Sequence, residues 1–332
     1  MPESSPISDE FRAVFLAASD SNQTLSFERF MALALYDPNV GYYRKERQRI
    51  GYGGNTDFYT ATTSGTLLGE LVVAACATLL GDADPAEYTF VEAGAETNEG
   101  VLKGVTHPFR SARTCRIGEP LEISGRCVVF SNELFDAQPF RRFVGRNDNW
   151  REIGVRLQGD TLSEVELPTI APDYLPCPSS EGYTIDAPHA AAILAERIAA
   201  QPWTGLFVAC DYGKSWDEIE HACPAGTARS YFRHTQSNDL LARPGNQDLT
   251  CHICWDWMKA ALTRHSFVSS KVESQESFFV RHAGPFIAAL TAAEAARYSQ
   301  RKAALLQLLH PAHLGQKFQV LHAMRSTLPP NH

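Results

Sequence analysis

Two short apolar runs decide the fold of this chain: TFVEAG at residues 89–94 and CVVFSNE at residues 127–133. Each run ends abruptly in acidic, amide or glycine residues. A buried parallel strand has this pattern where its carboxyl end opens into a ligand crevice. The two runs therefore predict two strand ends that together hold a ligand.

The composition narrows the class of protein. With 332 residues, the chain is long enough for one large domain with an insertion or for two ordinary domains. The net charge of −8 and the scattered basic residues argue against a nucleic-acid partner. No apolar run approaches the roughly 20 residues that a membrane span needs, and the N-terminal stretch lacks the basic start and apolar core of a signal peptide. We therefore expect a cytoplasmic protein without a membrane segment.

The eight cysteines are expected to be reduced thiols, because most fall inside predicted strands and helices of a chain too large to need disulfides. Only Cys251 and Cys254 have the spacing of metal ligands, and no second pair matches them. A structural zinc site would need two more ligands, for which His221 and Cys223 are the nearest candidates. We expect buried thiols there and no metal.

The N-terminal part, residues 1–86, is predicted to hold two helices (7–18 and 27–36), a glycine-rich loop (51–62) and a longer helix (65–80). Three aromatic residues alternate with the glycines of the loop. This pattern favours a loop that folds over a flat ligand, although a surface loop without function would also be rich in glycine.

Residues 87–332 are predicted to form the main α/β domain. Strands at 113–118 and 126–131 are separated by too few residues for a helical crossover, so either the unit is shortened or the two strands are not neighbours. Strands at 140–144, 150–157 and 161–167 predict an antiparallel insertion over about 140–184, with a hairpin turn at Gly159-Asp160.

The later elements are predicted from local signals. Asp186 is expected to cap a helix that continues to residue 200. A third buried strand spans residues 204–213, a short strand lies at 277–280, and an amphipathic helix covers 292–309.

The chemistry is expected where the predicted parallel strands end, because ligands of open α/β sheets bind beyond the carboxyl ends of strands at the topological switch point. Three of these ends are polar: Glu92/Gly94, Asn132/Glu133 and Asp211/Tyr212. Glycine lets a backbone approach a ligand closely. Glu119, after the second strand, is a candidate acceptor for the hydroxyl groups of a ribose.

The loop after the first strand carries two acidic residues, Glu96 and Glu99, which would repel a pyrophosphate. A dinucleotide is therefore disfavoured. A ligand with a nucleoside and a positive centre but no phosphate fits the charge better, and S-adenosyl-L-methionine is such a ligand.

The second strand end places an amide and two carboxylates together, in Asn132, Glu133 and Asp136. In one interpretation, Glu133 and Asp136 anchor a cationic acceptor such as an arginine or an amine and direct its lone pair at a methyl group. Methyl transfer is an in-line displacement, so alignment does most of the work. In the alternative, Asn132 and Asp136 only cap the following helix and Glu133 is solvated.

Several runs of this chain resemble the MidA family, the bacterial relatives of the mitochondrial complex I assembly factor that methylates arginine. They are distributed in order over nearly the full chain. The matching runs are FMALALYDPNVGYY (30–43), DFYT (57–60) followed by LGE (68–70), SNELFDAQPFRRF (131–143), DYG (211–213), YFRHTQSNDLLARPGNQDLT (231–250) and LHPAHLGQKFQVL (309–321).

The resemblance implies a class I S-adenosylmethionine-dependent methyltransferase, an α/β fold with a Rossmann-like sheet, an N-terminal helical segment and an antiparallel insertion. It also implies roles for single residues. Cofactor contacts would come from Asp57, Phe58, Tyr59, Thr60, Glu92, Gly94 and Asn132, the acceptor would face Glu133 and Asp136, and the cleft would be lined by Asp211, Tyr212, Asn246 and Gln247.

The expected function is methylation of arginine in a protein substrate or of another nitrogen acceptor. Two alternatives stay open. In the family, the loop after the first strand resembles Glu-x-Gly-x-Gly-x-Gly, whereas this chain has Glu96 and Asn98 at the second and third glycines. That change favours a catalytically degenerate binding or assembly protein. A small-molecule methyltransferase is the other alternative, because the sequence does not identify the acceptor.

Overall fold

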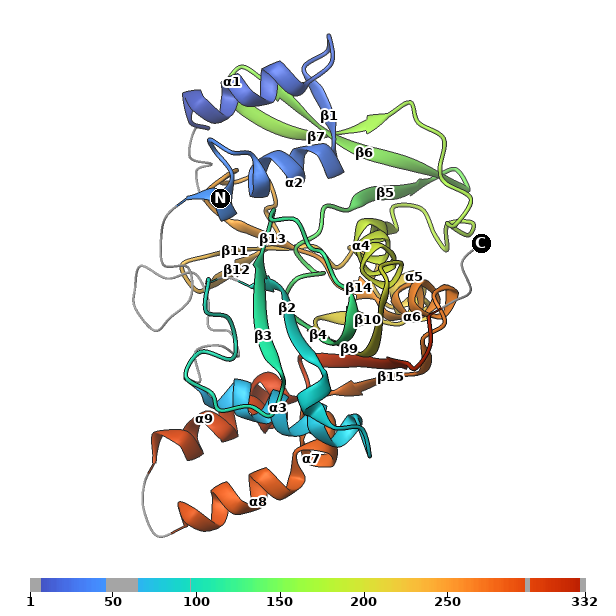
Figure 1. Ribbon diagram of the computed structural model, residues 1–332. Helices are drawn as coiled ribbons and strands as arrows, with labels where there is room; N and C mark the ends of the chain where they lie inside the picture. Colours follow the sequence, from blue (N-terminus) through green and yellow to red (C-terminus); the bar gives the residue numbers. More distant parts are fainter. Residues whose placement is uncertain (1–6, 46–64, 96, 296–298, 329–332) are drawn as a thin grey trace. The chain divides into compact units, whose positions relative to one another are not determined.

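The computed structural model describes residues 7–45, 65–95, 97–295 and 299–328 (Figure 1). The chain divides into two compact units, and each is described by itself. The first unit comprises Met1–Tyr59, Asp136–Ala191 and Lys214–Cys254, and the second comprises Thr60–Phe135, Ala192–Gly213 and Trp255–His332.

The second unit contains a six-stranded sheet with the order β15-β16-β9-β4-β2-β3. Its strands are β2 (Thr89–Ala95), β3 (Ser111–Arg116), β4 (Gly125–Asn132), β9 (Trp203–Asp211), β15 (Val268–Ser274) and β16 (Gln319–Arg325). The strands β3, β2, β4 and β9 are parallel, whereas β16 is antiparallel to both β9 and β15. Because β3 and β4 flank β2 on opposite sides, the winding of the sheet reverses between β2 and β4, which is a topological switch point.

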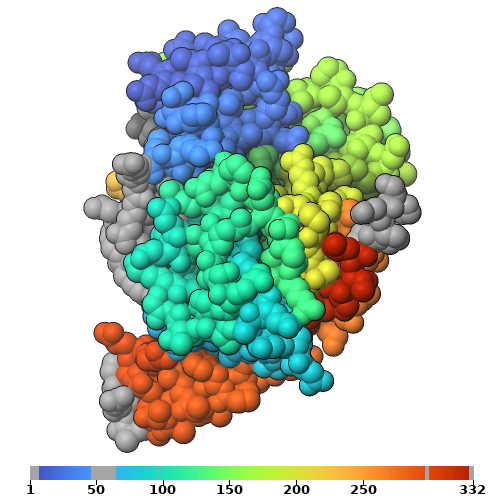
Figure 2. Space-filling model, viewed as in Figure 1, coloured from blue at the N-terminus to red at the C-terminus, as the bar shows by residue number. Residues whose placement is uncertain are grey.

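One face of this sheet packs against helices from distant parts of the chain. The helices α3 (Leu67–Leu79), α7 (Gln275–His282) and α9 (Gln300–Leu309) contact one another, and α8 (Gly284–Ala293) contacts α3 and α7 (Figure 1). Leu71 and Val72 of α3 join Phe90 and Phe130 of the sheet in one buried apolar cluster. The orange segment of Figure 2, which includes α8, lies at the surface of this unit.

The remaining elements of the second unit are α6 (Trp255–Arg264) and the short helices η3 (Pro85–Glu87) and η4 (Pro311–Gly315). The helix α4 (His189–Ala199) begins in the first unit and ends in the second. Within the described residues, no helix is both long and apolar enough to cross a bilayer.

The first unit is built on an antiparallel sheet with the order β1-β6-β5-β8, in which β7 also pairs with β6. Its strands are β1 (Thr24–Ser26), β5 (Arg141–Arg146), β6 (Asn149–Gln158), β7 (Thr161–Leu167) and β8 (Thr184–Ala187). The helices α1 (Asp9–Ala18) and α2 (Phe27–Tyr36) supply Phe11, Phe15, Phe27 and Phe30 to its buried core. The antiparallel sheet therefore combines the N-terminal segment with the expected insertion.

The first unit also contains a three-stranded sheet with the order β12-β11-β13. Its strands are β11 (Arg229–Phe232), β12 (Thr235–Ser237) and β13 (Asp248–Thr250). The other short elements are η1 (Tyr42–Arg44), α5 (Trp216–His221) and β14 (Ile253–Cys254), and β10 (Gly213–Lys214) begins at the last residue of a segment of the second unit.

The expected mixed α/β fold with an antiparallel part is confirmed. The strands predicted at 113–118 and 126–131 correspond to β3 and β4, which are not neighbours, because β2 lies between them. Ser26 caps α2 as expected, since its side chain accepts a hydrogen bond from the backbone N–H of Arg29.

Three predictions of local structure are wrong. Residues 277–280 belong to α7, because the Ser274 side chain caps that helix and Phe278 and Phe279 are buried in the core. The helix predicted over 292–309 is two helices, since α8 ends at Ala293 and α9 starts at Gln300. Asp186 lies in β8 instead of capping a helix, and its carboxylate accepts hydrogen bonds from two backbone N–H groups, those of residues 227 and 228.

Candidate functional site

The carboxyl ends of β2 and β4 lie next to each other in the second unit, since Glu92 and Phe130 are paired residues of the two strands. Gly94 adopts a left-handed conformation with φ of +76°. A Cβ atom at Gly94 would lie 2.5 Å from Cδ1 of Leu134. The turn after β4 therefore packs directly on the end of β2, where only glycine fits without displacing Leu134.

The loop after β2 is held by hydrogen bonds within the protein. The Glu92 side chain is buried, and its Oε2 accepts a hydrogen bond of 2.6 Å from the backbone N–H of Val101. Thr114 of β3 donates to the carbonyl oxygen of Asn98 at 2.6 Å. A Cβ atom at Gly100 would lie 2.1 Å from Glu92 Oε2, so the loop returns over the carboxylate at a glycine. In this structure Glu92 fixes the path of the loop.

Burial raises the pKa of Glu92 to about 7, and the hydrogen bond from Val101 partly opposes this shift. Sequence reasoning proposed Glu92 as a cofactor residue but missed its partner Val101 and the bond between Thr114 and Asn98. In the sequence, Gly100 was the available sign of the bond to Val101, because a glycine lets the backbone of the loop approach the Glu92 carboxylate closely.

The end of β4 differs from the end of β2 in its backbone conformation and in its hydrogen bonds. Glu133 has a φ of +52°, which is unusual and costly for a residue other than glycine. Its backbone N–H donates to the carbonyl oxygen of Cys210 at 3.0 Å, and its Oε1 accepts from Asn132 Nδ2 at 3.0 Å. Asn132 Oδ1 is buried and has no hydrogen-bond partner in the described part of the chain. This end therefore presents an acceptor that a ligand with an N–H or O–H group would satisfy.

Asp211 joins the end of β9 to the turn after β4. Its side chain is fully buried, its Oδ2 accepts a hydrogen bond of 2.8 Å from the backbone N–H of Phe135, and its Oδ1 accepts one of 2.9 Å from Tyr212. The ring of Tyr212 packs on Phe318, with the ring centroids 4.1 Å apart. Asp211 thus positions backbone around the strand ends.

Glu119 is exposed and lies three residues after β3, the strand beside β2. Its Oε2 accepts a hydrogen bond of 2.9 Å from the backbone N–H of Arg116. The carboxylate therefore lies at the same edge of the sheet as Gly94, and its predicted contact with ribose hydroxyl groups stays a prediction.

The first unit brings together four residues that we call the tyrosine–aspartate cluster: Tyr36, Tyr43, Asp136 and Asp248. Both aspartates are buried. Tyr43 donates a hydrogen bond of 3.0 Å to Asp248 Oδ1, Tyr36 donates one of 2.7 Å to the carbonyl oxygen of Ala137, and the two tyrosine rings stack with centroids 5.5 Å apart. Burial raises the pKa of Tyr36 well above its usual value, and the charges of Asp248 and Asp136 raise it further.

Of this cluster, sequence reasoning proposed only Asp136.

The predicted cleft residues Asn246 and Gln247 lie just before Asp248. The Gln247 side chain is buried and donates to the carbonyl oxygen of Leu240 at 2.9 Å, while the exposed Asn246 accepts from Lys45 Nζ at 2.7 Å. Gln247 thus holds its own loop.

The predicted cofactor residues Asp57, Phe58, Tyr59 and Thr60 lie outside the described residues. Cys251 and Cys254 are buried and form no disulfide, and the backbone N–H of Cys251 donates to the carbonyl oxygen of Asp136 at 3.0 Å. The roles predicted for the individual site residues stay predictions.

Comparison with known sequences assigns the chain to a family. Residues 65–272 match the family Methyltransf_28, described as "Putative S-adenosyl-L-methionine-dependent methyltransferase". The chain belongs to this family. S-adenosyl-L-methionine is the cofactor that membership assigns to it, as the sequence predicted, and the resemblance to MidA-like methyltransferases is confirmed.

Three known proteins are similar to the chain over most of its length. The mitochondrial "Protein arginine methyltransferase NDUFAF7" of Danio rerio is 22% identical, and the match covers 91% of this chain and 84% of the relative. A crystal structure of a COG1565 superfamily member from Burkholderia thailandensis, bound to S-adenosyl-homocysteine, has a TM-score of 0.83 at 22% identity and covers 96% of this chain and 92% of its own. A native structure of a COG1565 superfamily protein from the same species has a TM-score of 0.77 at 20% identity, with the same coverage. The two structures show that the chain shares their fold.

The residues at the switch point fit S-adenosyl-L-methionine. The buried, unpaired Asn132 Oδ1 suits an N–H or O–H donor, and the ligand carries such groups on its amine, ribose and adenine. Glu119, three residues after β3, places a carboxylate at this edge of the sheet, which suits a cationic sulfonium ligand.

Proposed function

We propose that the protein methylates a nitrogen of an arginine side chain in a protein substrate, using S-adenosyl-L-methionine and a Rossmann-like sheet in the second unit. The support comes from family membership and from the similarity, at 22% identity over 91% of the chain, to a protein named as a protein arginine methyltransferase. The sheet order and the switch point between β2 and β4 support the Rossmann-like arrangement.

The observation that carries the choice of acceptor is the tyrosine–aspartate cluster. Asp136 and Asp248 are both buried, and both lie near enough to the Tyr36 hydroxyl to raise its pKa. Two buried carboxylates concentrate negative charge in one cluster, which favours a cationic over an anionic ligand. A guanidinium group also matches carboxylates geometrically, because it donates hydrogen bonds in a planar fork.

The chain's own groups have separate tasks in this proposal. When bound, S-adenosyl-L-methionine supplies a methyl group that is activated by its sulfonium centre. Asn132 and the backbone at Gly94 bind the cofactor in the second unit. Within the first unit, Asp136 and Asp248 are the groups whose charge suits a guanidinium acceptor. Methylation of a guanidinium nitrogen releases one proton, which the carboxylate of Glu133 accepts. Holding the acceptor in line supplies most of the rate enhancement.

The acceptor is tested by incubating the protein with methyl-tritiated S-adenosyl-L-methionine and arginine-containing protein substrates, followed by acid hydrolysis and amino-acid analysis. We expect label in methylarginine. Asp136→Asn and Asp248→Asn should lower the rate, whereas the matched control Asp160→Asn should keep it, because Asp160 is an exposed residue of the same unit that pairs with Arg12. Label in methyllysine or in small molecules only would contradict the arginine assignment.

A binding or assembly protein without catalysis is the second candidate, favoured by Asn98, whose carbonyl oxygen is tied to Thr114 where the family has a glycine. Calorimetric titration with S-adenosyl-homocysteine separates the two. Failure to bind at millimolar ligand would overturn the enzyme proposal, and binding without label transfer to any acceptor would favour the second candidate. The cytoplasmic location and the protein substrate are part of the proposal.

A further inference from the structure

Three side chains in the second unit converge on one point away from the switch point. They are Glu273 at the end of β15, His282 at the end of α7 and His322 in β16. Glu273 Oε2 lies 3.2 Å from His282 Nε2 and 3.1 Å from His322 Nε2. All three candidate ligand atoms lie within 4.8 Å of one another.

The cluster is held by regular secondary structure. Glu273 pairs with Val320 in the β15–β16 ladder, two residues from His322. The ring of Phe278 in α7 packs on both imidazoles, with centroid distances of 5.2 Å to His282 and 5.6 Å to His322. Side chains that are packed on helices and strands keep their ligand atoms in place, which a metal site requires.

The three residues are also largely shielded from solvent. The exposed fraction is 8% for the Glu273 side chain, 7% for His322 and 14% for His282. A surface group of acidic residues is solvated and needs no ion, whereas two imidazoles and a carboxylate in a partly dry setting form a recognisable donor set. Nitrogen ligands from histidine with one carboxylate oxygen are typical of zinc.

The distances agree with a zinc ion. Bonds of about 2.0–2.2 Å in a tetrahedral site place neighbouring ligand atoms roughly 3.3 Å apart. The two measured Oε2 to Nε2 separations are 3.1 and 3.2 Å. An ion can therefore replace the proton that each imidazole donates to Glu273, with only a small outward shift of the ligands.

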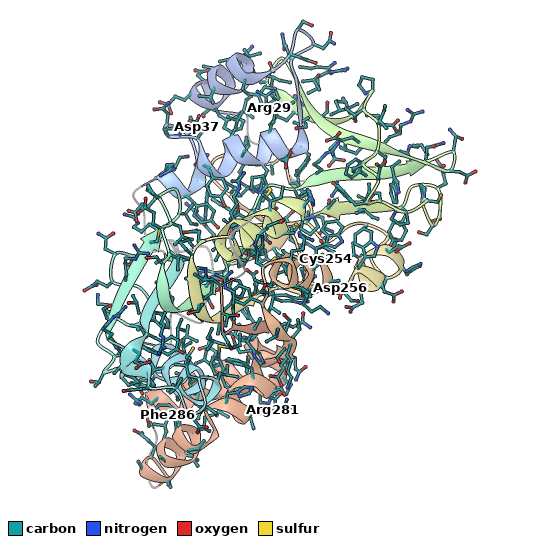
Figure 3. All side chains as sticks on the ribbon, turned by 45° about the vertical axis from the view of Figure 1, so that its right-hand side comes forward. Arg29, Asp37, Cys254, Asp256, Arg281 and Phe286 are labelled. Atoms are coloured by element: carbon teal, nitrogen blue, oxygen red, sulfur yellow. The ribbon has the colours of Figure 1, made fainter. Side chains whose placement is uncertain are left out.

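Arg281 is the competing cation. Its Nη1 lies 2.6 Å from Glu273 Oε1, the oxygen that the imidazoles do not contact. The Arg281 side chain is 58% exposed, and Figure 3 labels this residue by the helical segment that also carries Phe286. It can therefore move into solvent without leaving a buried charge, and Oε2 stays directed at the histidines in either case.

We propose that Glu273, His282 and His322 bind one zinc ion that ties α7 to the β15–β16 edge of the sheet. Three protein ligands leave the fourth position to water. The ion joins segments that lie 49 residues apart in the chain. It stabilises the folded state, and the gain in unfolding free energy rises with the logarithm of the zinc concentration relative to the dissociation constant. This site is independent of the proposed methyl transfer.

The test uses the full chain, freed of metal by a chelator, and titration with zinc sulfate by calorimetry. We expect one high-affinity equivalent and a rise in the melting temperature. His282→Gln, His322→Gln and Glu273→Gln should each remove the high-affinity step. The matched control is His310→Gln, because His310 is exposed, lies in the same unit and has another histidine ring, His313, 5.3 Å away.

Two further measurements distinguish a zinc site from a purely structural ion pair and from zinc bound by thiols. Arg281→Gln should tighten zinc binding, because it removes the cation that competes for Glu273, whereas a purely structural ion pair predicts no such gain. Cobalt(II) substitution should give a tetrahedral spectrum without a thiolate charge-transfer band, which also tests the wild-type protein if a ligand variant fails to fold. A thiolate band, or zinc affinity unchanged in His282→Gln and Glu273→Gln, would overturn the proposal.

Discussion

The ends of β2 and β4 are adjacent in the sheet but use their polar groups in opposite ways. At the end of β2, Glu92 accepts a hydrogen bond from Val101, and the carbonyl oxygen of Asn98 accepts one from Thr114. These polar groups are therefore already hydrogen-bonded within the protein. At the end of β4, Asn132 keeps a buried acceptor without a partner in the described chain, and Glu133 is held in a left-handed conformation.

This difference indicates a division of labour. The first end sets the shape of the backbone, and in our proposal the second end supplies groups for recognition and chemistry. Substitutions at the first end should therefore act mainly on stability and on the shape of the site. Substitutions at the second end should act on ligand affinity and turnover with little effect on stability.

The largest expected effect on the free energy of unfolding is that of a substitution at Gly94. Gly94→Ala adds a left-handed strain of roughly 1–2 kcal/mol to an overpacking cost of roughly 1–3 kcal/mol against Leu134, for a total loss of unfolding free energy of about 2–5 kcal/mol. Urea unfolding measures this loss, and calorimetry should show weaker binding of S-adenosyl-homocysteine because the turn after β4 is displaced.

Gly81→Ala is the matched control, because Gly81 has a φ of +63° but a Cβ atom added there would have no neighbour within 4 Å. It should cost only the roughly 1–2 kcal/mol of backbone strain. Adding Leu134→Ala to Gly94→Ala should relieve the overpacking. Equal losses at Gly81 and Gly94 would show that the contact between the two strand ends is unimportant.

The next largest effect is the dependence of the unfolding free energy on pH, which Glu92 controls. Its pKa rises from 4.5 to about 7 on folding, so the folded state holds this proton more tightly. The stability that this group contributes is complete below pH 4.5 and is lost as the pH rises through about 7, by about 3 kcal/mol.

Glu92→Gln removes the titration but keeps an oxygen that can accept from Val101. Relative to the wild type, the variant should therefore gain stability as the pH rises from 4.5 to 7. Free energies of unfolding measured in urea at several pH values check this expectation. Parallel pH profiles for the two proteins would contradict the assigned role of Glu92.

The smallest effects on stability are expected at the end of β4. Asn132→Ala should weaken S-adenosyl-homocysteine binding about tenfold, the equivalent of one hydrogen bond, and should change the unfolding free energy by less than about 1 kcal/mol. Glu133→Gln should keep the affinity and lower the rate of methyl transfer. Similar losses of affinity in both variants would contradict separate roles for these two residues.

The sequence predicted the elements whose signals are local. The strands β2, β4 and β9 are continuous apolar runs with polar ends, and Ser26 precedes an apolar helical pattern. The strand predicted at 277–280 is wrong because a short apolar run suits a strand or a buried helix equally well. The cap at Ser274 and the packing of the core decide in favour of the helix.

The candidate site was predictable only where its residues adjoin a strand end. Glu92, Gly94, Asn132 and Glu133 could be named for that reason. Tyr43 and Asp248 are 205 residues apart, and only the folded chain brings the hydroxyl and the carboxylate together. The bond between Glu92 and Val101 depends likewise on the path of a loop, which no periodicity encodes.

The position of β16 has a consequence for biosynthesis. This strand lies between β9 and β15, although α7, α8 and α9 separate it from β15 in the chain. A nascent chain that has emerged only as far as α9 therefore exposes the edges of β9 and β15. Such unpaired edges can join other chains. Slow release of residues 319–325 from the ribosome should therefore make aggregation more frequent, and the protein should depend on chaperones until β16 closes the sheet.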